Sequence, residues 1–303
     1  MGGSSDADTR RIAPARLVED PALAVPVGGV LTFEPLFVRA NNSPVGLESL
    51  KNWGAFEGVL LALLTRHAGK DEVLGSAVVV APGVAVAARH VVDHLSDGIR
   101  DGTTHLLCIG LTSDCCDLWR IHKITCLDGA DLAILGLVRA SELPKHSLRL
   151  AAITTRAPMV GDQLLIAGFR AEGNVQRLAE KSYLVRGNVL ISQGKVTQRF
   201  MSGRDRVMLP SSCLEVDCDS VGGMSGGPVF DSSGQLVGVL SSSLSSATRV
   251  GPSFVTLLWP ALVQRFEGGW PSGLFEEPTT LLELDRRLRF IDNDQCFGKT
   301  QAP

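Results

Sequence analysis

Short apolar runs separated by turn residues fill most of the chain after Gly58, and they constrain its fold more than any other feature. Runs of this kind, bounded by Gly, Pro, Asn and Asp, predict β-hairpins rather than helices. The chain is therefore predicted to be all-β, although the strand pattern alone fits a β-sandwich as well as a pair of barrels. We expect a first series of strands at 59–66, 73–80, 84–88, 105–111, 118–127, 131–138 and 163–169, and a second at 181–190, 206–210, 213–218, 227–230, 235–243 and 253–258.

The N-terminal part differs in composition from this strand-rich part. Residues 1–56 are rich in Pro, Gly, Ser and Asn and show little sustained periodicity. We expect an N-terminal arm that lies outside the core, with a short helix at 46–56.

The C-terminal part predicts two helices. One is expected from Trp259, in WPALVQRF, packed on the second series of strands. The other lies in the C-terminal extension, residues 269–303, where PTTLLELDRRLRFID follows Thr279 or Thr280 as the candidate N-cap. We expect this later helix to pack on its own chain, and the alternative is that it docks a partner.

The segment GGMSGGP, residues 222–228, carries the most specific chemical signal. Glycines on both sides of Ser225 allow a tight turn that presents the serine hydroxyl, because glycine accepts backbone angles that other residues avoid. Ser225 is therefore a candidate nucleophile. A serine hydroxyl also needs a base and an orienting acid.

A base and an acid stand in the expected order before Ser225. His90 follows the apolar run GVAVAA, and Asp131 opens DLAIL, with Asp128 as the alternative acid. The spacings are close to the roughly 45 and 93 residues of the Ser-His-Asp template. An α/β-hydrolase would place its acid and histidine after the serine, and residues 241–303 contain no histidine.

The segments AARHVV, DLAIL and GMSGGPV resemble the three signature segments of the trypsin/chymotrypsin family of serine proteases. The likeness is greatest to its bacterial members, including the high-temperature-requirement type. The resemblance implies two six-stranded antiparallel β-barrels with the active site in the cleft between them. It covers residues 57–268, with barrels at about 57–168 and 169–268, so that His90 and Asp131 lie on the first.

The resemblance also implies roles for individual residues. Ser225 would attack the scissile carbonyl, His90 would take its proton, and Asp131 would orient the imidazole. The backbone N–H groups of Gly223 and Ser225 would form the oxyanion hole. Met224 stands where vertebrate zymogens carry an aspartate, which puts that activation route in doubt.

A substrate pocket is implied by the same alignment. Asp219 would lie at its base and accept a Lys or Arg side chain, unless Asp217 is the aligned aspartate and Asp219 is only a loop acid. Ser241 and Ser243 would form the pocket wall, with Ser241 bordering Asp131. Arg89, next to the histidine, is expected to be a solvated flanking residue.

Composition excludes several other classes of function. The net charge of −3 has no dense block of either sign, so we expect no nucleic-acid and no membrane partner. The N-terminus MGGSSDADTRR lacks a basic region followed by an apolar stretch, and the apolar runs fall well short of the roughly 18 residues of a membrane span, so we expect the chain to be neither secreted nor membrane-spanning. We expect neither metal nor organic cofactor, and we interpret His94 with Asp93 as a surface pair rather than as metal ligands.

The number and spacing of the cysteines indicate in which redox compartment the protein is located. Seven are present, an odd number, at spacings that fit neither a disulfide framework nor a zinc site, which favours reduced thiols in the cytoplasm. The sequence thus predicts a bacterial, cytoplasmic serine endopeptidase that acts on protein or peptide substrates and that a protein partner regulates. The alternatives are a latent or partner-activated binding module with the same fold, and an esterase or acyl-transfer enzyme.

Overall fold

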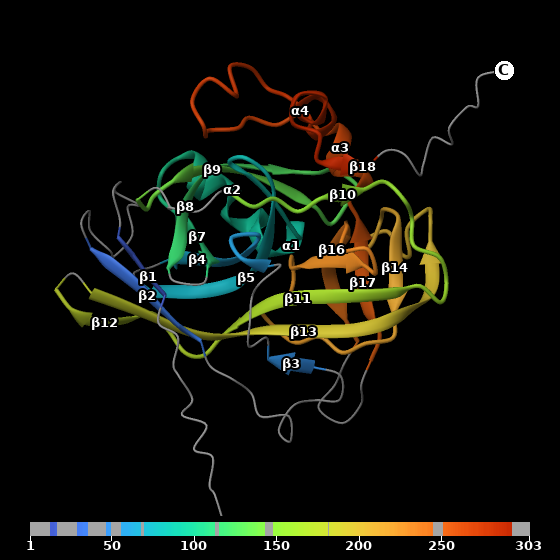
Figure 1. Ribbon diagram of the computed structural model, residues 1–303, viewed down its shortest axis with the longest axis horizontal. Helices are drawn as coiled ribbons and strands as arrows, with labels where there is room; N and C mark the ends of the chain where they lie inside the picture. The colour runs from blue at the N-terminus through green and yellow to red at the C-terminus, as the bar shows by residue number, and fades with distance from the viewer. Residues whose placement is uncertain are drawn as a thin grey trace, which may run out of the picture.

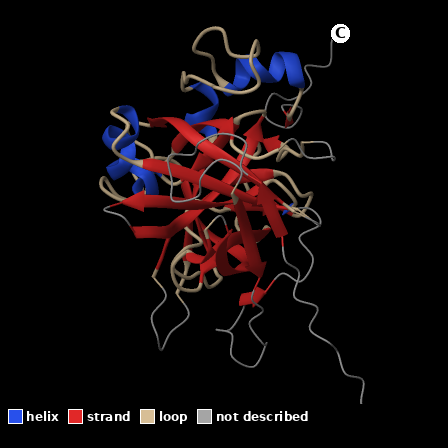
Figure 2. Cartoon of the chain, turned by 90° about the vertical axis from the view of Figure 1, so that its left-hand side faces the viewer, coloured by secondary structure: helices blue, strands red, loops and turns tan. Residues whose placement is uncertain are grey.

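The computed structural model describes most of the chain from residue 56 and three short segments before it. The described residues are 13–16, 29–35, 47–49, 56–67, 70–112, 115–142, 148–180, 182–244 and 251–292. Strands dominate the molecule, and the helices lie at its periphery (Figure 2).

Six antiparallel strands close the first barrel in the order β4-β5-β6-β9-β8-β7. Figure 1 labels all of them except β6. They are β4 (Leu60–His67), β5 (Lys70–Ala81), β6 (Val84–Ala87), β7 (His105–Leu111), β8 (Cys116–Cys126) and β9 (Ala133–Arg139). Strand β5 shows why such runs are almost wholly apolar. Its residues Ala77 and Val79 belong to one buried cluster, and Val78 and Val80 belong to another, so both faces of the strand are buried.

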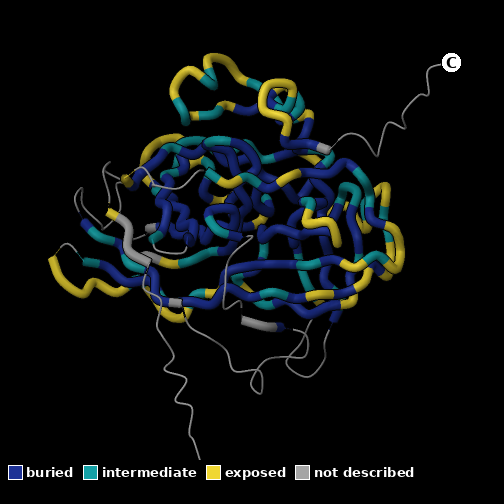
Figure 3. Tube along the Cα trace, in the orientation of Figure 1, coloured by how far each residue is buried: buried dark blue, intermediate teal, exposed yellow. Residues whose placement is uncertain are grey.

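A second barrel closes through successive antiparallel pairs in the order β11-β13-β14-β17-β16-β15. Its strands are β11 (Gln163–Ala171), β13 (Ser182–Phe200), β14 (Cys213–Val216), β15 (Pro228–Asp231), β16 (Leu236–Ser243) and β17 (Ser253–Leu257). The two barrels lie side by side, and the buried part of the trace runs through both (Figure 3). The expected pair of six-stranded antiparallel barrels is confirmed.

One predicted strand belongs to the second barrel instead of the first, and another predicted strand is a loop. The first barrel closes where β9 pairs with both β6 and β8, which leaves no edge for a seventh strand, so residues 163–169 form β11 of the second barrel. Residues 206–210 are not a strand. The Asp205 carboxylate accepts hydrogen bonds from the N–H groups of Val207, Met208 and Leu209, and these donors are then unavailable to a ladder.

The described parts of the N-terminal region add strands to the second barrel. Strands β1 (Ala13–Arg16) and β2 (Val30–Pro35) pair with each other, and β2 pairs in parallel with the start of β13. Leu31 and Phe33 on β2 are fully buried, so this part of the arm lies inside the core rather than outside it. Strand β12 (Gln176–Ala179) pairs with the opposite edge of β13.

The short helix expected at 46–56 is wrong at residues 47–49. Residues 47–49 form strand β3 (Leu47–Ser49), which pairs with Leu190–Ser192 of β13 in the interval between β2 and β14. Pairing satisfies backbone groups on that edge of β13, and Leu47 is buried in the second-barrel core.

Short helices follow β6 and β17. Helix α1 (Arg89–Val92), the 3₁₀ turn at Asp93–Leu95 and α2 (Ser96–Arg100) follow β6, and α3 (Trp259–Val263) follows β17. Helix α4 (Leu281–Leu288) begins with a capping box in which Thr280 and Glu283 bond reciprocally, as expected for one of the two candidate N-caps. No helix among the described residues has the length and apolar character to cross a membrane.

The C-terminal extension is tied back to the barrels. Strand β18 (Ile291–Asp292) pairs in parallel with β10 (Ile153–Thr154), which in turn pairs with β16. Leu281 and Leu284 of α4 are buried in the core cluster, so the described part of the later helix packs on its own chain.

Candidate active site

His90 and Asp131 contact each other through three hydrogen bonds. The His90 Nδ1 atom lies 3.1 and 3.0 Å from the two Asp131 carboxylate oxygens, and the His90 backbone N–H donates to Oδ1 at 3.0 Å. The Asp131 side chain is 9% exposed and that of His90 is 39% exposed. With Nδ1 turned to the carboxylate, the Nε2 atom is left to exchange a proton with a group in the adjacent pocket.

The Asp131 carboxylate is kept ionised by its surroundings. Burial raises the pKa of Asp131, but the hydrogen bonds and charge of His90, together with the Ser241 hydroxyl, lower it to a net value below the ordinary one. The alternative acid, Asp128, is fully exposed and lies 3.6 Å from Arg89 instead. Asp131 is therefore the acid that contacts the imidazole.

Arg89 is more than a solvated flanking residue. Its Nη1 atom donates to the Leu127 carbonyl at 2.8 Å, and its Nε lies 3.5 Å from Asp93 one helical turn later. The Leu127 N–H donates to the Leu132 carbonyl at 3.0 Å, which closes the turn that holds Asp131. Arg89 therefore ties the helix of His90 to the turn of Asp131.

Ser225 lies on a turn packed between the two barrels. A side chain on Gly226 would collide with the Ser76 carbonyl of β5 and would lie 3.0 Å from the Ala88 nitrogen, at the start of α1. The turn therefore lies against the helix that carries His90. Among the described residues the Ser225 hydroxyl has no hydrogen-bond partner, His90 included. Such bonds are often long or poorly aligned in the absence of substrate.

Between Gly223 and Gly227, two backbone N–H groups are unpaired among the described residues. Those of Met224, Gly226 and Gly227 donate to the carbonyls of Val221, Leu240 and Met224 at 3.1, 2.7 and 2.9 Å. No bond to a described residue uses the N–H groups of Gly223 and Ser225, which are the two that the sequence predicts as oxyanion donors. The Met224 side chain is fully buried in the second-barrel core.

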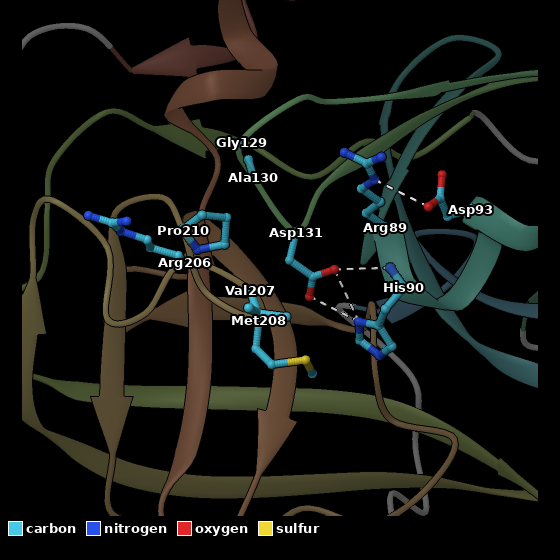
Figure 4. A pocket seen from close by; sticks show the side chains of 10 residues that line it. All are labelled: Arg89, His90, Asp93, Gly129, Ala130, Asp131, Arg206, Val207, Met208 and Pro210. Atoms are coloured by element: carbon cyan, nitrogen blue, oxygen red, sulfur yellow. Dashed lines mark hydrogen bonds and ion pairs between the residues drawn. The ribbon is translucent and has the colours of Figure 1, made fainter.

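A pocket of about 380 Å³ opens beside the His90 and Asp131 pair (Figure 4). One wall comes from the first barrel, and the other comes from the loop after β13. The sequence does not reveal the loop residues of this wall, because the composition of RVMLP is that of a strand. The sequence signal that favours a loop over a strand here is Asp205, directly before the run, because Asp side chains bond to the backbone of the following residues in turns. The lining residues are Arg89, His90, Asp93, Gly129, Ala130, Asp131, Arg206, Val207, Met208 and Pro210.

The predicted substrate-pocket residues lie on neighbouring strands or next to them. Asp219 is 5% exposed, whereas Asp217 is exposed. The Ser241 hydroxyl bonds to Thr256 at 2.6 Å, and Ser243 pairs with Ser253 across β16 and β17. The Ser241 hydroxyl also lowers the pKa of the Asp131 carboxylate.

Within the described part of the chain, no three His, Cys, Asp or Glu side chains lie together as metal ligands. Six of the seven cysteines fall in this part, and all six are free thiols: Cys108, Cys115, Cys116, Cys126, Cys213 and Cys218.

The solved structures to which the chain is similar include several proteases. The active form of the Rv3671c protease from M. tuberculosis aligns at 16% identity with a TM-score of 0.47, over 73% of this chain and 89% of that one. The MamO protease domain from Magnetospirillum magneticum aligns at 15% identity and a TM-score of 0.44, over 68% and 95%. The HtrA-type protease AlgW with a decapeptide aligns at 17% identity and 0.46, over 68% and 62%.

A search among curated proteins gave no match to this chain. The family model described as the trypsin-like peptidase domain matches residues 75–239, which is more than half of the chain. This range includes the helix that carries His90 and the turns that carry Asp131 and Ser225. The chain therefore belongs to the family of trypsin-like peptidase domains and is a serine endopeptidase.

Proposed function

We propose that the chain hydrolyses peptide bonds through Ser225, His90 and Asp131. The observation that carries this proposal is the pairing of His90 Nδ1 with both oxygens of a buried, ionised Asp131. It fixes the tautomer in which Nε2 takes the Ser225 proton as the hydroxyl attacks the scissile carbonyl. The imidazole then returns this proton to the leaving amine, and a water molecule hydrolyses the acyl-enzyme by the same steps in reverse.

The N–H groups of Gly223 and Ser225 are proposed to stabilise the tetrahedral oxyanion. They are unpaired among the described residues, while the intervening Met224 N–H is bonded to Val221. Donors that are already directed toward the developing charge need no reorganisation during the reaction. The loss of one such donor typically costs about 3 to 4 kcal/mol of transition-state stabilisation.

The first test is cleavage of a positional peptide library by the wild-type protein and by Ser225→Ala, read by mass spectrometry. Cuts made by the wild type and absent in Ser225→Ala are expected. A fluorophosphonate probe should label the wild type and not the variant. If neither protein cuts or labels while both are folded, the triad does not act in the isolated chain, and the latent, partner-activated module replaces this proposal.

We also propose that Asp219 selects Lys or Arg before the scissile bond. Its burial beside Ser220, whose hydroxyl bonds to Ser253 at 2.9 Å, supports a polar pocket floor. Asp219→Asn should lower kcat/KM for Lys and Arg substrates by more than tenfold, because a carboxylate binds a cation far more strongly than an amide does. Asp217→Asn, at an exposed position, is the control. Equal preference in wild type and Asp219→Asn would contradict this assignment.

We further propose that the protein is located in the reducing cytoplasm and that a protein partner regulates its activity. The six described cysteines are free thiols, which supports a reducing compartment. Copurification from the native cell with a protein that changes the rate of probe labelling would identify the partner. Labelling of the isolated chain at the full rate, unchanged by the lysate, would contradict it.

A further inference from the structure

Ser76 on β5 is fully buried and faces the second barrel. Its neighbours Ala77 and Val79 fill one core cluster, while Val78 on the other face joins the cluster that includes Phe169 of β11. Because side chains alternate along a strand, the Ser76 hydroxyl lies on the Val78 face. It is a polar group in the contact between the barrels, and its hydrogen bonds need to be accounted for.

The Ser76 hydroxyl joins three segments. It donates to the Gly223 carbonyl at 2.8 Å and accepts from the Phe169 N–H at 2.8 Å. The assignment of donor and acceptor is unambiguous, since Phe169 N–H can only donate and the Gly223 carbonyl can only accept. The Ser76 backbone N–H also donates to the Ser225 carbonyl at 2.9 Å. One residue of the first barrel thus holds the carbonyls on both sides of Met224.

These bonds fix the peptide plane next to the proposed oxyanion donors. The Gly223 carbonyl is bonded to Ser76, and the N–H of the same peptide, that of Met224, is bonded to Val221. The direction of the Gly223 N–H relative to this fixed plane depends only on the φ and ψ of Gly223. Its φ is +94°, in a region where glycine moves easily, so the turn needs an external anchor to hold one conformation.

We propose that Ser76 is a positioning residue for catalysis: its hydroxyl holds the turn so that the Gly223 and Ser225 N–H groups face the oxyanion. The inference rests on the proposed function and deepens it. Ser76 acts through the turn and touches neither substrate nor the reacting atoms. Its contribution should therefore be confined to states in which the oxyanion carries charge.

Ser76→Ala removes both hydrogen bonds of the hydroxyl. We would measure kcat and KM for a peptide substrate. The kcat is calculated per active site, and the active sites are counted from the final extent of Ser225 labelling by a fluorophosphonate probe. We expect kcat to fall about ten- to a hundredfold with little change in KM, less than the roughly 100- to 1,000-fold for loss of an oxyanion donor itself. A peptide aldehyde, which forms a tetrahedral adduct on Ser225, should bind more weakly by the same factor as kcat/KM.

Ser141→Ala is the matched control. Ser141 is also buried and hydrogen-bonded in the first barrel, where its hydroxyl accepts from the Leu118 N–H at 3.0 Å, but it lies outside the proposed site. This variant should lose stability and keep its kcat per labelled site. A merely structural role for Ser76 would give the same pattern.

The outcomes separate the two proposals. An unchanged kcat and aldehyde affinity in Ser76→Ala, beside an active wild type, overturns the role of Ser76 alone. An inactive wild type overturns the proposed function, and the role of Ser76 with it. If Ser76→Ala does not fold, Ser76→Cys replaces it. A thiol is a weak donor, so a smaller loss of kcat is expected, and an undiminished kcat contradicts the proposal.

Discussion

Arg89 links the two residues on which the proposed proton transfer depends. Its guanidinium bonds to the Leu127 carbonyl, at the base of the turn that holds Asp131, from the residue next to His90. Arg89→Met keeps most of the aliphatic stem and removes the donor. We expect a loss of about 1 to 2 kcal/mol in the free energy of unfolding, since the side chain is one-third exposed, and a fall of less than tenfold in kcat.

Urea denaturation and steady-state kinetics measure both effects. Arg100→Met is the control, because the Arg100 side chain is 73% exposed and its one hydrogen bond among the described residues is to Asp97, in an exposed pair of the kind that contributes little to stability. If Arg89→Met and Arg100→Met behave alike, Arg89 is the solvated flanking residue that the sequence predicts.

The sequence predicts some residues of the proposed site and misses others. The difference depends on whether the neighbours of a residue in the sequence carry a signal. His90, Asp131 and Ser225 each lie in a short segment whose neighbours carry a local signal. Ser76 and Arg89 carry none, because their partners lie 147 and 38 residues away. A single serine in an apolar strand becomes informative only when the fold brings Gly223 to it.

At the scale of elements, local pattern predicts strands well and their partners less well. The run QLLIAGF is a strand as expected, yet only the closure of the first barrel by β9 decides that it pairs in the second. The run RVMLP has strand-like composition, but the Asp205 carboxylate accepts hydrogen bonds from its N–H groups. The run is therefore a loop, and it lines one wall of the pocket. At 47–49 the chain pairs with the long strand β13 and forms a strand, where we expected part of a short helix.

At the scale of the whole molecule, the C-terminal extension joins the barrels. After α3 the chain returns to the first barrel, where Trp270 packs on Trp119 with ring centroids 5.2 Å apart, and later β18 pairs with β10. His122 on β8 lies against Gly269, the residue before Trp270. Its Nε2 atom is buried without a partner among the described residues, and a side chain on Gly269 would press on it.

The packing of His122 against the C-terminal extension is expected to make the free energy of unfolding depend on pH. Burial lowers the pKa of His122, as do the charges of Arg120 and Lys123, and Glu267 opposes them. A histidine with a lowered pKa binds fewer protons when folded than when unfolded, so its contribution is fully present above about pH 6.5 and is lost as the pH falls below that value.

His122→Gln should therefore lose less stability than the wild type between pH 7.5 and pH 5.5, as measured by urea denaturation at the two pH values. The imidazolium carries a proton on Nε2, and this atom is buried against Gly269 without a hydrogen-bond partner among the described residues, so charging His122 costs free energy in the folded state. Replacement of the exposed His94 by Gln controls for the general loss of an imidazole. Parallel pH dependences in wild type and His122→Gln would show that the extension stays docked whatever the charge of His122.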